Sequence, residues 1–219
     1  MEAIVLLGIL CAASSVAVKV EEQVLLAKSA GAICMVSPTG VHFAAVIAKG
    51  SRAAVVYDGV ESKRFDAILS PSGAVFLARP SGPPGGQPPY ASPVVFSPDG
   101  EHYAYAAHDG DDYVVMVDGK ELARGRWEES SPALGPFAFS PAGNHFYFGV
   151  QSRDTSDPKA GFHLQVDDKV GPTSRYPTTS SPDSNDAIVF SPDGAHYAYI
   201  GSTTRDQPDV KWAVVGTIC

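Results

Sequence analysis

One phrase recurs along this chain: Ser-Pro-x-Gly, one further residue, then His and an aromatic residue that opens a strand-like run. Each copy places the turn residues Pro and Gly directly before residues that favour β-strands. Such self-similarity is typical of repeat architectures, in which each unit buries its apolar face against its neighbours. Full copies begin at Ser37, Ser97, Ser140 and Ser191, and a degenerate copy, Ser70-Pro-Ser-Gly-Ala-Val-Phe, begins at Ser70.

The unit that contains Ser97 shows the predicted strands most clearly. Apolar or alternating runs are separated by turns such as Asp118-Gly119, which favour antiparallel hairpins. With 21 Gly and 18 Pro in 219 residues, the composition also suits many short strands joined by turns. The four predicted strands of this unit are residues 93–97, 102–108, 113–118 and 120–124.

Counting units gives a prediction for the whole fold. We expect an all-β protein, a β-propeller of about five four-stranded antiparallel blades. The second blade is predicted to be incomplete, because the Pro-rich stretch from Ser81 to Tyr90 cannot donate the hydrogen bonds of a central strand. The fifth unit reaches Cys219 without a fourth strand, so closure of the ring by the N-terminal strand 23–28 is our hypothesis.

The first 17 residues differ from the repeats. Residues 3–17 resemble the apolar part of an export signal, and Ser15-Val16-Ala17 is a small-x-small cleavage site, although Glu2 stands where a basic residue is usual. The alternative is a buried N-terminal strand or short helix. We therefore expect a signal peptide at 1–17, a propeller domain at 18–219 and a periplasmic or secreted protein, or a cytoplasmic one if residues 1–17 are not a signal.

The repeat phrase itself resembles a known family. Ser97-Pro-Asp-Gly-Glu-His-Tyr-Ala-Tyr, followed by the Val-Val-x-Val-Asp-Gly hairpin at 114–119, is similar to the TolB-type, WD-like β-propeller repeat of bacterial exported proteins. The resemblance covers about residues 20 to 219. It implies a propeller with a periplasmic or cell-surface interaction role and names no partner. The chain departs from the pattern at Val215-Gly-Thr-Ile-Cys, where Val-Asp-Gly-Lys is expected, so a fragment of a longer propeller remains an open alternative.

Four histidines invite a metal-site interpretation, but the repeat argues against it. One His per unit is spread around a ring, whereas a metal needs its ligands around one centre. We expect each His to pack beside its turn or to bond a backbone carbonyl, and each turn Asp to bond its own backbone two residues on. We predict no metal and no cofactor. The residues concerned are His42, His102, His145 and His196, with Asp58, Asp99, Asp118, Asp167 and Asp193.

Other chemistry has little support in the sequence. There is no Gly-x-Ser-x-Gly elbow, no phosphate-binding loop before a helix and no Cys-x-x-Cys pair. A formal net charge of −8 gives nucleic acid binding no electrostatic support, and no later segment is predicted to cross a membrane. Cys34 and Cys219 are expected to be buried thiols, with a disulfide between them as the alternative. We predict that the protein is not an enzyme.

The predicted topology separates two faces. In a meander, the Ser-Pro-x-Gly and Asp-Gly turns share one face, and the longer, variable loops share the other, which we call the long-loop face. Variable loops on a rigid scaffold are where recognition usually occurs. We predict noncatalytic binding of a protein or peptide there, with a propeller hydrolase or lyase acting in the central channel, or an accessory domain of a larger enzyme, as alternatives. Oligomeric state is left open. The candidate partner-binding residues are Arg126, Trp127, Arg153, Asp154, Arg175, Tyr176, Arg205 and Asp206.

Overall fold

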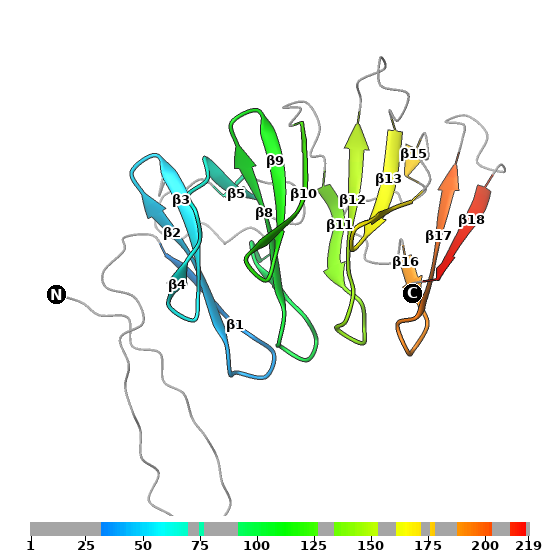
Figure 1. Ribbon diagram of the computed structural model, residues 1–219, viewed down its shortest axis with the longest axis horizontal. Coiled ribbons are helices and arrows are strands. Elements are labelled where there is room, and N and C mark those ends of the chain that lie inside the picture. The colour runs from blue at the N-terminus through cyan, green and yellow to red at the C-terminus, as the bar shows by residue number, and fades with distance from the viewer. Residues whose placement is uncertain are drawn as a thin grey trace, which may run out of the picture.

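Every regular element that the structure describes is a β-strand. The computed structural model describes residues 32–69, 75–76, 92–126, 134–152, 161–171, 176–177, 188–202 and 211–217. Within these ranges the strands form antiparallel sheets that stand side by side in an open row (Figure 1). The all-β prediction is confirmed.

Four sheets follow one another along the chain in the described ranges. The first contains β1 (Ile33–Val36), β2 (Phe43–Lys49), β3 (Arg52–Tyr57) and β4 (Val60–Glu61). The second contains β5 (Ala67–Leu69), β6 (Val75–Phe76), β7 (Val95–Phe96), β8 (Tyr103–Asp109), β9 (Asp112–Val117) and β10 (Lys120–Arg126). The third contains β11 (Leu134–Phe139), β12 (Phe146–Ser152), β13 (Gly161–Val166) and β14 (Lys169–Val170). The fourth contains β15 (Tyr176–Pro177), β16 (Ile188–Phe190), β17 (His196–Ser202) and β18 (Lys211–Thr217).

The repeat count predicted about five blades, whereas the described residues form four sheets. The degenerate copy at Ser70 accounts for the difference. Its strands do not form a sheet of their own: β5 pairs with β8, with Ala67 opposite His108, and β6 pairs with β5. The strand before the Ser97 turn, β7, pairs with the other end of β8, with Val95 opposite Ala104. Two short strands therefore share the place that one long strand would fill. The described strands of the second unit, β5 and β6, therefore belong to the sheet of the third unit, and the Pro-rich stretch from Ser81 to Tyr90 lies outside the described residues.

Apolar cores lie between neighbouring sheets. Val46 and Val55 of the first sheet pack with Tyr105 and Val114 of the second in one buried cluster. Aromatic side chains fill the next junction, where Phe137 packs edge-on against Phe146. Burial on both faces explains the continuous apolar runs of β2, β8 and β9, because a strand with only one covered face would alternate.

Cys34 differs from its predicted environment. The side chain is exposed, whereas the sequence suggested a buried thiol. Its neighbour Met35 packs against the core between the first two sheets, and successive residues of a strand face opposite sides. Cys34 therefore points away from that core. Partial burial still raises the pKa of its thiol. Cys219, the proposed closing strand 23–28 and the predicted signal at 1–17 lie outside the described residues.

Candidate functional site

The face that carries the Ser-Pro-x-Gly turns is built identically in each full unit. In the second sheet the Ser97 N–H donates to the His102 carbonyl, and the Gly100 N–H donates to the Ser97 carbonyl, both at 2.9 Å. The buried Ser97 hydroxyl also accepts the His102 N–H at 2.9 Å. The same three bonds recur in the turns that begin at Ser37, Ser140 and Ser191. The phrase thus encodes a closed hydrogen-bonded turn.

Each of the first three sheets adds a histidine–aspartate pair to this face. Nδ1 of His42 lies 2.6 Å from Oδ2 of Asp58, while Oδ1 of Asp58 accepts the Phe43 N–H at 3.0 Å. The carboxylate therefore joins the turn between the third and fourth strands to the start of the second strand. The equivalent pairs are His102 with Asp118 and His145 with Asp167, each at 2.8 Å.

These pairs revise the roles expected for the turn residues that recur in each unit. His42, His102 and His145 bond carboxylates rather than backbone carbonyls, because the two turns of one sheet meet at the same face. Asp58, Asp118 and Asp167 bond a neighbouring strand rather than their own turn, and all three have positive φ, between 46° and 52°. Asp99 follows the expectation: its Oδ1 accepts the Glu101 N–H two residues on, at 3.2 Å.

Successive turns also touch one another across the sheet junctions. A Cβ at Gly100 would lie 2.6 Å from Oγ1 of Thr39 in the preceding turn, and one at Gly143 would lie 3.0 Å from Oδ2 of Asp99. Gly194 is approached in the same way by Asn144, at 2.8 Å. These glycines are needed both for their positive φ and for the close approach of the next turn. The described turns of this face therefore pack against one another as scaffold.

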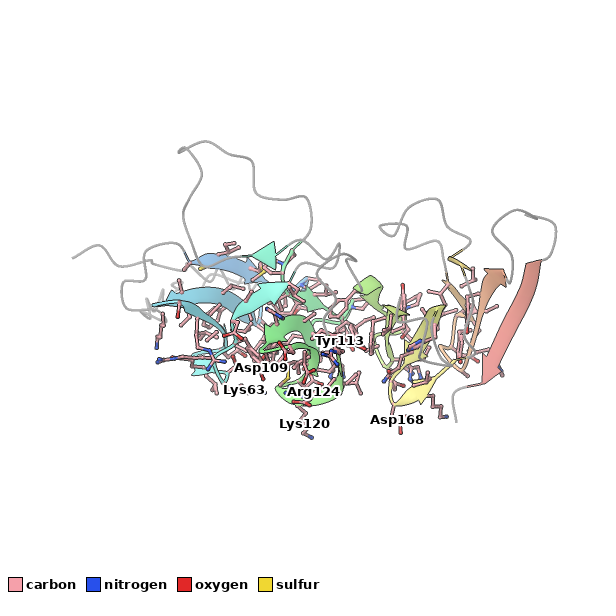
Figure 2. All side chains as sticks on the ribbon, turned by 90° about the horizontal axis from the view of Figure 1, so that it is seen from above. Lys63, Asp109, Tyr113, Lys120, Arg124 and Asp168 are labelled. Carbon is pink, nitrogen blue, oxygen red and sulfur yellow. The ribbon has the colours of Figure 1, made fainter. Side chains whose placement is uncertain are left out.

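The long-loop face has a different chemistry where the first two sheets meet. Asp109, at the end of β8, accepts hydrogen bonds from Arg52 and Lys63 at 3.2 Å and from Arg124 at 3.3 Å. Asp66 accepts the Gly110 N–H at 2.7 Å. Figure 2 shows Lys63, Asp109 and Arg124 gathered at this place. We call these five residues, Arg52, Lys63, Asp66, Asp109 and Arg124, the Asp109 cluster.

The Asp109 cluster comes from a charge reversal between equivalent turns. The turn between β2 and β3 is bounded by the opposed residues Lys49 and Arg52. The equivalent turn between β8 and β9 is bounded by the opposed residues Asp109 and Asp112. Basic ends on one sheet therefore meet acidic ends on the next. On the turn face, the Ser, Pro, Gly and His of the four full copies recur, and the two positions between them vary without a change from basic to acidic residues.

The charges of this cluster shift one another's ionisation. Partial burial by itself would raise the pKa of Asp109, but hydrogen bonds from Lys63 and Arg124 outweigh it and hold the pKa below its ordinary value. The hydrogen bond from Arg124 lowers the pKa of Glu121. Bonds from Glu121 and Asp112 raise the pKa of Arg124. The acidic and basic side chains at this junction therefore form a network of ion pairs.

Two of the predicted partner-binding residues fall in described strands. Arg126 ends β10 opposite Asp112 and is exposed, and Tyr176 in β15 lies opposite Ser202. Both positions are at the long-loop ends of their strands, as the topology predicts (Figure 1). The other candidates lie outside the described residues: Trp127, Arg153, Asp154, Arg175, Arg205 and Asp206.

The sequence reasoning missed the histidine–aspartate pairs and the Asp109 cluster. Two of the three pairs share one separation, since His42 and Asp58 lie 16 residues apart, as do His102 and Asp118, whereas His145 and Asp167 lie 22 residues apart. The cluster joins residues up to 57 positions apart, and no local pattern marks it.

Within the described ranges, no group of three or more His, Cys, Asp or Glu side chains is arranged to hold a metal ion. None of the described segments is a helix long and apolar enough to cross a bilayer.

Comparisons with known proteins give distant structural likenesses. No protein-family model matches the chain, and no curated protein matches it. TolB from Acinetobacter baumannii is similar with a TM-score of 0.38 and 13% identity, over 90% of this chain and 44% of that one. A candidate 6-phosphogluconolactonase from Bacteroides uniformis is similar with a TM-score of 0.31 and 13% identity, over 76% of this chain and 46% of that one. The chain thus spans less than half the length of each of these two structures.

Proposed function

We propose that this chain is a noncatalytic propeller-type repeat protein that binds another protein or an extended peptide through its long-loop face. The observation that carries the proposal is the contrast between the two faces. On the turn face, the His, Asp and Ser side chains of the repeat bond one another, so they are used in holding the sheets. On the long-loop face, the equivalent turns differ in charge and sequence.

Unit-specific residues on a rigid scaffold suit recognition. Arg126 extends from the end of β10 beside the Asp109 cluster, and Trp127 follows it in the sequence. Arg and Trp are enriched among the residues that dominate binding energies at protein interfaces. The proposal includes export to the periplasm or cell exterior, which rests on the sequence of residues 1–17.

A capture experiment tests this proposal. The exported chain is immobilised and compared with a variant that carries Trp127→Ala, Arg153→Ala and Arg205→Ala, and with a turn-face control that carries Lys120→Ala and Lys169→Ala. Both lysines begin outer strands after the tight turns, β10 and β14. We expect the first variant to lose specific partners and the control to keep them. Equal recovery of every protein by all three would overturn the proposal, and capture of a small metabolite instead would favour an enzyme.

A further inference from the structure

The junction between the first two sheets contains a pair of tyrosines that no other described junction repeats. The rings of Tyr57 in β3 and Tyr103 in β8 are stacked, with centroids 3.9 Å apart and planes 9° from parallel. Other tyrosine pairs in the described ranges, such as Tyr103 with Tyr105, are separated by more than 6 Å. The positions equivalent to Tyr57 in the next two sheets are Val117 and Val166, so the repeat does not require this pair.

The surroundings keep the two rings in register. His42 stacks on Tyr57 with ring centroids 5.6 Å apart, and the Phe96 ring centroid lies 6.5 Å from that of Tyr57. Both tyrosines are only partly buried, so small solutes can reach their edges. Burial and then the Asp58 carboxylate raise the pKa of Tyr57 to about 12, and burial and then Asp118 raise that of Tyr103. Both phenols are therefore neutral at physiological pH.

We infer that Tyr57 and Tyr103 are the site of an oxidative dityrosine cross-link that joins the first and second sheets. A peroxide-driven one-electron oxidant removes one electron and one proton from each phenol. The two phenoxyl radicals then couple through a carbon beside each hydroxyl-bearing carbon, and the hydrogens on the coupled carbons move to the oxygens as the rings regain aromaticity. Overall, two tyrosines and one hydrogen peroxide give one dityrosine and two waters. The two rings already face each other, with centroids 3.9 Å apart, before the radicals form.

The consequence for the molecule is a covalent tie across a sheet junction. That junction also contains the apolar core, the close approach of the Gly100 and Thr39 turns, and the partly exposed Asp109 cluster. The link would close a loop between residues 57 and 103, which contains the strands of the incomplete unit. Such a closure removes conformational freedom from the unfolded chain.

The test is oxidation of the folded, full chain with a peroxidase and hydrogen peroxide, and in a second arm with a small photo-oxidant and persulfate. We expect dityrosine fluorescence in the monomer fraction. Tryptic fragments containing Tyr57 and Tyr103 should be joined, with a mass below their sum by that of two hydrogen atoms. Tyr57→Phe and Tyr103→Phe, which keep a stacked ring, should each reduce the monomer signal at least tenfold. Tyr113→Phe, whose side chain is buried in the next junction, should leave it unchanged.

Two results with the folded protein would overturn the inference. One is monomer fluorescence that persists in Tyr57→Phe while thermal unfolding shows that the variant is folded. The other is a native protein whose joined fragments contain other tyrosines. The same oxidation in denaturant should abolish the linkage of Tyr57 to Tyr103, and an undiminished yield there would show that the folded stack is not responsible.

Discussion

The imidazole of His102 and the carboxylate of Asp118 form a 2.8 Å hydrogen bond across the two tight turns of the second sheet. The other carboxylate oxygen of Asp118 accepts the N–H of Tyr103 at 3.1 Å. One side chain thus satisfies a backbone donor at the start of β8 and holds the histidine that follows the Ser97 turn. The same arrangement recurs in the first and third sheets.

Replacing Asp118 should therefore weaken folding more than replacing an ordinary turn aspartate. Asp118→Ala leaves the Tyr103 N–H without its acceptor and places Ala at a φ of 49°, and we expect a loss of about 1–3 kcal/mol in the free energy of unfolding. Asp118→Gly relieves the backbone strain and should lose less. Urea denaturation measures the difference, with Asp111→Ala in the exposed β8–β9 turn as the control. Equal stability of Asp118→Ala and the control would contradict the assigned role.

The stacking of turns predicts a difference between two equivalent glycines. Gly40 and Gly100 have φ of 74° and 79°, but a Cβ at Gly40 meets nothing within 4 Å, whereas one at Gly100 meets Thr39. Gly40→Ala should cost about 1 kcal/mol from strain alone. Gly100→Ala should cost about 1–3 kcal/mol more because of the clash.

A double-mutant cycle separates strain from the clash. Combining Gly100→Ala with Thr39→Ala should recover part of the loss, since the two sites are coupled only if they touch. Additive effects of the two substitutions would show that the turns do not pack as described.

The Asp109 cluster should make a small, salt-sensitive contribution to stability. Asp109→Asn removes the charge shared by Arg52, Lys63 and Arg124, and we expect a loss of about 0.5–1 kcal/mol at low ionic strength. Because these groups are partly exposed, the loss should shrink in 1 M salt. Asp111→Asn in the same turn is the matched control. An effect of the same size at low and high salt would argue against an electrostatic origin.

The shifted pKa values predict losses of stability at both pH extremes. Asp109 and Glu121 have lowered pKa values, so their contribution is present above the pKa of the unfolded chain, about 4, and is lost as the pH falls through their folded values. Burial raises the pKa values of Tyr105 and Tyr199 to about 12, as burial and Asp58 do for Tyr57. Their contribution is full below about pH 10 and is lost as the pH rises toward 12.

Unfolding free energies across the pH range check this prediction. We expect a plateau near neutrality, an acid decline and a separate alkaline decline. Tyr105→Phe should reduce the alkaline decline and leave the acid one unchanged. An alkaline slope that is the same in Tyr105→Phe and the unchanged chain would contradict the assignment.

Local chemistry made most of the scaffold predictable. Turns such as Ser97-Pro-Asp-Gly are specified by residues within six positions of one another, and the apolar runs that follow them specify buried strands. The sheet that the degenerate copy at Ser70 joins could not be predicted. Its strand β5 pairs with β8, with Ala67 opposite His108, and this pairing depends on which sheet has an unpaired edge. The sequence shows that this unit departs from the repeat, but the strand with which it pairs is determined by long-range contacts.

For the candidate partner-binding residues, the sequence predicted the end of the sheets at which they lie, and their role in binding stays a prediction. Meander topology places Arg126 and Tyr176 at the same end of their sheets, and the structure has them there. To predict the Asp109 cluster, one would have to know that the turn containing Arg52 lies beside the turn containing Asp109. That proximity is a property of sheet packing, and neither turn carries a local sign of it.

The most direct test measures stability and partner binding together on two variants. The turn-face variant, Asp118→Ala, should lose stability but bind a captured partner with unchanged affinity at a temperature where it remains folded. The long-loop variant, with Trp127→Ala, Arg153→Ala and Arg205→Ala, should keep its stability and lose at least tenfold in affinity. The account would be contradicted if the turn-face variant lost the partner while folded, or if the long-loop variant bound it as tightly as the unchanged chain.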